Sequence, residues 1–86
     1  MTSDQRIELA RHARSLLDNK ATQLIFEMLR AETLHALENT KPGESSIREE
    51  LYHELRALKR HEARLRAIAK DGEAEELRIQ SRSLST

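Results

Sequence analysis

The stretch "NTKPGESSIREE", residues 39–50, decides the fold, because it contains the only Pro of the chain and one of its two Gly residues. Pro42 disfavours the helical conformation at the residue before it, and Gly43 accepts backbone angles that end a helix. Ser46 and Glu49 match the S-x-x-E capping box that opens a helix. The stretch therefore predicts a turn between two helices. The alternative, a phosphate loop of Walker type, needs an upstream Gly and a preceding strand, and the sequence offers neither here.

Apolar residues recur at helical spacing on both sides of this turn. They predict one helix over residues 20–39 and another over residues 46–71, with a possible extension to residue 80 and an end or weak point at Gly72. Joined by so short a turn, the two helices are expected to form an antiparallel hairpin with coiled-coil-like packing. The expected internal seam consists of Leu24, Ile25, Met28 and Leu29 against Leu51, Leu55, Leu58 and Leu65. Residues 81–86 are expected to form a disordered tail.

A shorter helix over residues 3–17 precedes the hairpin, and a capping box from Thr2 to Gln5 opens it. Asp18 and Asn19 favour helix caps over helix interiors, so they predict a break before the next helix. One continuous helix over residues 3–39 is the alternative. The expected fold class is all-α, as a single helical domain over residues 1–80.

The composition favours helices that are covered by a partner. The chain has 86 residues, no Cys, two aromatic residues and equal numbers of acidic and basic side chains. So short a chain buries little of its own surface, yet the apolar stripe of residues 20–39 is wider than one seam requires. The helix over residues 3–17 could fold back and cover the stripe in a three-helix bundle. If it projects instead, the sequence predicts a homo-oligomer or binding to another protein. The candidates for the outward contact are Phe26, Leu34, Leu37 and Tyr52.

The sequence offers little for chemistry. The four His residues lack the spacing of a metal site, no Ser pairs with a His in an evident pocket, and no Gly-rich loop is present. We therefore expect no catalytic residues, no metal and no cofactor, and a protein that is not an enzyme. Glu62 is the one polar member of the heptad-like seam of residues 46–71, where it and His61 could fix the register. No apolar run reaches the roughly 20 residues of a membrane span, and no signal peptide is evident. The expected location is cytoplasmic or within a virion, with no membrane.

Basic residues gather between Arg56 and Lys70, where Arg56, Arg60 and Arg64 recur every four residues on one helix face. Two interpretations are open. The ridge could pair with the acidic residues of the helix over 20–39, across the hairpin or between copies, or it could bind phosphates of a nucleic acid or nucleotide. In the second case the protein would be a packaging factor or an anti-defence sponge that sequesters a signalling nucleotide.

Residues 10–75, which include "ARSLLDN", "REELYHELRAL" and "LRAIAKDGE", are similar to small helical proteins of tailed bacteriophages encoded among virion or packaging genes. In those proteins the residue after "LLDN" is often Pro, where this chain has Lys20. The resemblance implies a phage origin and a structural or accessory role, with a phage structural protein as a possible partner. Its motifs concern capping and packing, so the resemblance implies no active site.

Overall fold

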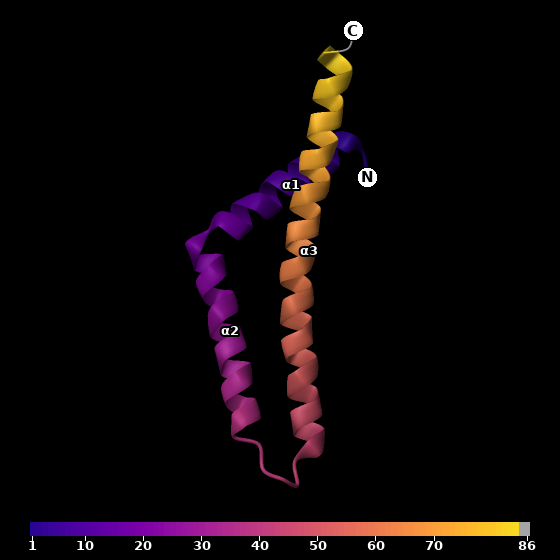
Figure 1. Ribbon diagram of the computed structural model, residues 1–86. Helices are drawn as coiled ribbons and strands as arrows, with labels where there is room; N and C mark the ends of the chain where they lie inside the picture. Colours follow the sequence, from indigo (N-terminus) through magenta and orange to yellow (C-terminus); the bar gives the residue numbers. More distant parts are fainter. Residues whose placement is uncertain (85–86) are drawn as a thin grey trace.

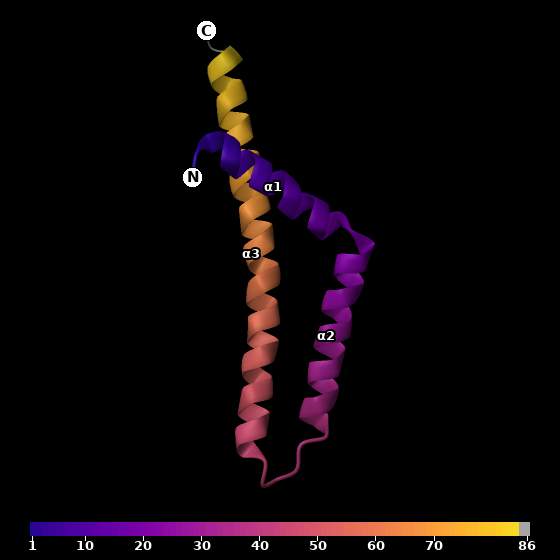
Figure 2. The same cartoon turned by 180° about the vertical axis from the view of Figure 1, so that it is seen from behind.

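In the computed structural model, which describes residues 1–84, the chain forms three α-helices, and those residues contain no strand. The helices are α1 (Ser3–Asp18), α2 (Lys20–Glu38) and α3 (Ser45–Leu84). The all-α prediction is confirmed. α2 runs beside one half of α3 in the opposite direction, and α1 crosses the other half (Figures 1 and 2). The body is elongated, with extents of 67 × 24 × 17 Å.

The two ends of α1 form as the sequence predicts. The Thr2 hydroxyl accepts a hydrogen bond from the Gln5 amide at 3.2 Å, and the Gln5 side chain accepts one from the Thr2 amide at 2.9 Å. After α1, Asn19 has extended backbone angles, and its side chain accepts hydrogen bonds from the amides of Ala21 and Thr22. One asparagine thus separates the two helices, so the predicted break is confirmed and the continuous helix is not formed.

The connection between α2 and α3 differs in detail from the prediction. α3 begins one residue before Ser46, so Ser46 lies inside the first turn and the hydrogen bonds of its predicted capping box are absent from the described residues. Instead, the Glu44 carboxylate accepts a hydrogen bond from the Lys41 amide at 2.8 Å. The Arg48 guanidinium donates to the Lys41 carbonyl at 2.9 Å. The turn is therefore closed by side chains that reach back from the start of α3.

α3 does not end near Asp71; it continues through the predicted possible extension to residue 80 and remains helical to Leu84. The predicted disordered tail is therefore wrong for residues 81–84, while residues 85–86 lie outside the described part of the chain. The turns after Gly72 are rich in Glu, Ala, Leu and Arg, and they sustain the helix because most of these residues are good helix formers.

Gly72 is the point where α1 and α3 come closest. A Cβ placed on Gly72 would lie 2.0 Å from the Ala10 Cβ and 2.9 Å from the Arg6 carbonyl oxygen. The expectation that this glycine ends or weakens the helix is wrong, because here the absence of a side chain permits a helix crossing. α1 makes its main contacts with α3 at this crossing, and these are more extensive than those between α2 and α3.

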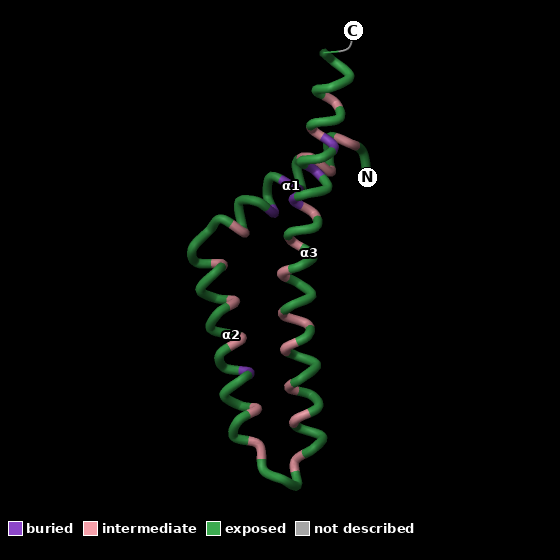
Figure 3. The backbone as a smooth tube through the Cα atoms, viewed as in Figure 1, coloured by how far each residue is buried: buried purple, intermediate pink, exposed green. Residues whose placement is uncertain are grey.

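The buried core is small and consists of alanines. Ala10, Ala13 and Ala69 are the buried apolar residues of the described chain, and no large side chain there is fully buried. Along α2 the half-buried and buried stretches lie toward α3, and the exposed ones lie on the opposite side (Figure 3). The interior is therefore concentrated at the α1–α3 crossing, and α2 is covered on one side only.

Candidate interaction surface

The side of α2 that faces α3 carries mixed chemistry. Its residues recur at steps of four, four, three and four, and they are Thr22, Phe26, Arg30, Thr33 and Leu37. Arg30 donates to the Glu62 carboxylate of α3 at 2.6 Å, which fixes the rotation of α2 about its axis. The predicted α2 half of the seam is therefore wrong. Arg30 and Thr33 can face α3 because both side chains have hydrogen-bond partners there. The Thr33 hydroxyl donates to the Leu29 carbonyl at 2.8 Å.

The α3 half of the seam agrees better with the prediction. The four expected leucines are half-buried on α3: Leu51, Leu55, Leu58 and Leu65. Glu62 lies among them with 16% of its side chain exposed and binds Arg30. His61 is exposed and takes no part in this pair. Glu62, the polar member of the seam, therefore pairs with Arg30 of α2. The sequence could have indicated this pair, because Arg30 is the lone arginine within the apolar stripe of α2.

We define the outer face of α2 as the side turned away from α3, formed by Ala21, Leu24, Ile25, Met28 and Ala31. Leu24, Ile25 and Met28 retain 53%, 52% and 51% of their surface, and Leu29 at the edge retains 36%. At one residue per 100° these side chains form a continuous apolar strip along about three turns of helix. Their exposure is a direct result of the rotation that turns Arg30 inward.

The four residues predicted to make an outward contact do not share a surface. Phe26 and Leu37 are half-buried on the side of α2 toward α3, and their predicted outward contact stays a prediction. Leu34 and Tyr52 are exposed at 44% and 50%, on different helices. Sequence reasoning missed the outer face because the apolar residues of α2 extend most of the way around the helix, and the most apolar side was assigned to the interior.

The basic ridge of Arg56, Arg60 and Arg64 lies exposed along α3. At four-residue steps its members are about 6 Å apart along the axis. None of the three takes part in an ion pair within residues 1–84. Pairing of the ridge with acidic residues of α2 across the hairpin is therefore absent from the described residues, and pairing between copies stays a prediction.

A cleft of about 420 Å³ lies between the α1–α2 bend and α3. Its wall carries charges of both signs, including Arg30, Glu62, Arg66 and Lys70. Glu62 holds Arg30 at 2.6 Å and Arg66 at 3.6 Å, so much of this charge is already neutralised. Residues 1–84 contain no cluster of three or more His, Asp or Glu residues placed to hold a metal ion.

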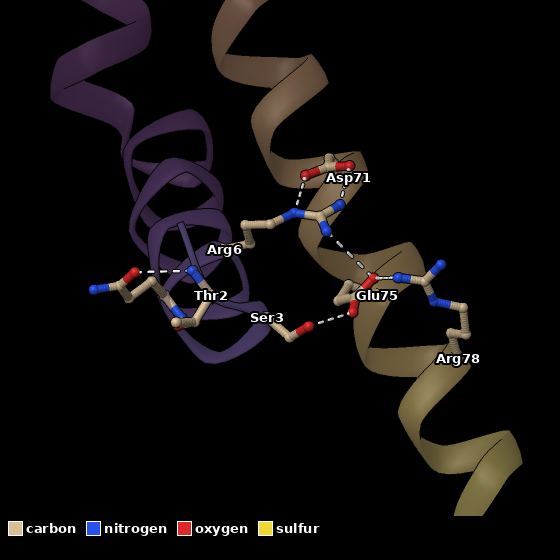
Figure 4. Close-up of polar contacts among 7 residues, drawn as sticks. Thr2, Ser3, Arg6, Asp71, Glu75 and Arg78 are labelled. Carbon is tan, nitrogen blue, oxygen red and sulfur yellow. Dashed lines mark hydrogen bonds and ion pairs between the residues drawn. The ribbon is translucent and has the colours of Figure 1, made fainter.

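The orientation of α2 depends on the position of α1 on α3. A network of polar side chains holds α1 against α3 (Figure 4). Arg6 donates to both oxygens of Asp71, at 2.7 and 3.0 Å, and lies 3.5 Å from Glu75. The Ser3 hydroxyl donates to Glu75 at 2.6 Å, and Arg78 binds the other oxygen of that carboxylate. Glu75 is buried, with 4% of its surface exposed, and all its oxygens have partners.

These contacts determine the protonation of the network. The hydrogen bond from Arg6 holds the pKa of Asp71 below its ordinary value and raises the pKa of Arg6 itself. The hydrogen bond from Ser3, with the charges of Arg78 and Arg6, holds the pKa of Glu75 below its ordinary value despite the cost of burial. Both carboxylates are therefore ionised at neutral pH, and the crossing is held by charge-assisted hydrogen bonds.

Two further ion pairs join α1 to α3 near the crossing. Arg11 contacts Glu76 at 2.8 Å, and Arg14 contacts Glu73 at 3.0 Å. α1 is thus attached to α3 along much of its length, and α2 follows from it through Asn19. The outer face of α2 is consequently presented in one direction by a fixed frame.

The chain matches no protein-family model, no curated protein and no solved structure. Among residues 1–84 there is no helix both long and apolar enough to cross a membrane.

Proposed function

We propose that this chain is a non-enzymatic helical assembly protein that associates with itself through the outer face of α2. One observation carries the proposal. Leu24, Ile25 and Met28 lie half exposed and adjacent on a single helix face, while the described chain fully buries no large side chain. Contiguous exposed apolar surface of this kind is typical of protein interfaces.

The total surface supports the proposal. A compact chain of 10.0 kDa is expected to expose about 5,200 Å². This chain exposes 6808 Å², about 1,600 Å² more than that expectation. A standard protein interface takes about 800 Å² from each partner. The radius of gyration is 18.6 Å, against about 12 Å for a compact chain of this length. The elongated shape accounts for the extra exposed surface.

The small amount of buried apolar surface also supports the proposal. A core of three alanines provides little hydrophobic stabilisation, because fully burying a leucine or methionine is worth about 1.5–3 kcal/mol and an alanine much less. Completing the burial of the half-exposed side chains on the outer face would add about 1 kcal/mol for each of them. Coiled-coil-like packing between copies would supply this burial.

Sedimentation at micromolar concentration tests the proposal. We expect the wild-type chain to sediment at a multiple of 10.0 kDa and the Met28→Glu variant at the monomer mass. Met28 is 51% exposed, so the monomer tolerates the charge, which circular dichroism would check. Leu34→Glu is the matched control, because Leu34 lies on the same helix at 44% exposure but off the outer face. A wild-type chain that remains monomeric would refute the proposal.

A second function is favoured by the basic ridge. Arg56, Arg60 and Arg64 are exposed and have no carboxylate partner within the described residues, so they are available to bind phosphates. We infer binding of a nucleic acid or a cyclic nucleotide, with affinity that falls as salt rises. The triple change of these arginines to Gln should abolish binding and leave the helical content unchanged. Undetectable wild-type binding at low salt would exclude this function.

The phage origin and the virion or accessory role that the resemblance implies stay predictions. Self-association through α2 is compatible with a structural role in a particle, since particles are built from repeated copies. The proposal itself rests on the exposed outer face and applies equally to an assembly outside a virion.

A further inference from the structure

Apart from Ile25, whose counterpart is Glu27, the residues of the outer face of α2 are arranged symmetrically along the helix. Leu24 and Met28 are equidistant from Phe26, and so are Ala21 and Ala31. At the ends of the strip, Lys20 and Glu32 are equidistant from the same point. All six are exposed, and neither Lys20 nor Glu32 takes part in an ion pair among the described residues.

From this symmetry we propose that two copies pair through the outer face of α2 in antiparallel orientation, about a two-fold axis that crosses this face at the level of Phe26 along the helix. The inference rests on the proposed function and specifies its partner as a second copy in one orientation and register. In a two-fold interface the same surface of each copy meets the other, so residues equidistant from the axis come together.

The antiparallel register matches each type of side chain to a suitable partner. Leu24 of one copy meets Met28 of the other, which places the two large apolar side chains in two equivalent central layers. The alanines at 21 and 31 meet in the next layers, where small side chains let the helix axes approach closely. Lys20 then lies near Glu32 of the second copy at both ends of the contact.

The parallel orientation fits the same residues poorly. It would place Lys20 beside Lys20 and Glu32 beside Glu32 of the second copy, and like charges across an interface oppose association. It would also place the two helix dipoles side by side in the same direction, with like ends adjacent, whereas antiparallel helices bring opposite ends together. Charge and packing therefore favour the same orientation.

Single-cysteine variants distinguish the two orientations, since the natural chain contains no Cys. In the antiparallel pair Leu24→Cys of one copy faces Met28→Cys of another, while two copies of the same variant have their thiols offset by about 6 Å along the axis. A disulfide needs Cβ atoms about 4 Å apart. We therefore expect mixed Leu24→Cys and Met28→Cys chains to cross-link through oxidation far more than either variant alone.

Charge reversal gives an independent readout by sedimentation. Lys20→Glu or Glu32→Lys alone should weaken the dimer about tenfold, because each places like charges at both ends of the contact. The double variant should restore wild-type affinity. In a parallel dimer neither single reversal would change affinity, because like charges face each other before and after the change.

The outcomes separate this inference from the proposed function. If Met28→Glu abolishes association but each cysteine variant cross-links with itself, the proposed function stands and the antiparallel register is overturned. The register is also overturned if the charge reversals leave affinity unchanged. If Met28→Glu leaves association intact, both the function and the register fail.

Discussion

Gly72 offers the sharpest test of the crossing between α1 and α3. Replacing it with alanine would normally stabilise a helix by about 1 kcal/mol, because glycine has the greater backbone freedom when unfolded. Here the added Cβ would lie 2.0 Å from the Ala10 Cβ and 2.9 Å from the Arg6 carbonyl oxygen. Carbon atoms in contact lie about 3.5–4.0 Å apart, so α1 must move outward by more than 1 Å. Neither neighbour is a flexible side chain that could rotate away.

The expected balance is destabilising. Overpacking of this kind costs about 1–3 kcal/mol, and the movement also stretches the contacts of Arg6 with Asp71 and Glu75. Against the gain in helix propensity of about 1 kcal/mol, we expect a net loss of up to about 2 kcal/mol. For a chain of this length that loss lowers the melting temperature by up to about 16 °C.

Thermal melts by circular dichroism measure this change, and amide exchange in α1 shows where the loss occurs. Gly43→Ala is the matched control, since nothing lies within 4 Å of its Cβ position and its φ is not positive. Adding Ala10→Gly to Gly72→Ala removes the shortest contact and should recover part of the loss. A Gly72→Ala variant that melts at or above the wild-type temperature would show that the helices do not cross this closely.

Three further predictions concern the other contacts. Asn19→Ala removes the side-chain cap of α2 and should cost about 1 kcal/mol, measured by urea unfolding. Arg30→Leu leaves Glu62 without its closest partner and should destabilise the chain by about 1–2 kcal/mol, while Leu at both positions should restore stability. Hydrogen bonds lower the pKa of Asp71 below 3.8 and that of Glu75 below 4.5. The ionised carboxylates therefore stabilise the folded chain at neutral pH, and this stabilisation is lost as the pH falls from about 4.5 through the lowered pKa values. Amide exchange in α1 should therefore accelerate in acid before that of the turn between α2 and α3.

Local signals along the chain predicted the element boundaries well. The capping box at Thr2, the break at Asn19 and the turn at Pro42 depend on interactions within a few residues, and such interactions can be recognised from sequence. The ends of α1 and α2 consequently agree with the prediction to within one residue.

Long-range contacts were not predictable in the same way. Gly72 resembles a helix terminator until α1, from the other end of the chain, is seen to pack against it. The rotation of α2 likewise depends on the Arg30–Glu62 pair, which joins two helices and overrides the preference for burying the most apolar side. The location of the outer face could therefore be identified only from the packed helices.

The Ala10–Gly72 crossing also has a consequence for how the chain folds. It joins segments near opposite ends of the sequence, so closing it costs more chain entropy than forming the turn between α2 and α3. Neighbouring helices joined by a short turn can meet early, whereas contacts of high sequence separation slow folding. Refolding should begin at the turn and finish with the docking of α1, so Ala10, Ala13 and Ala69 become buried only in the last kinetic step.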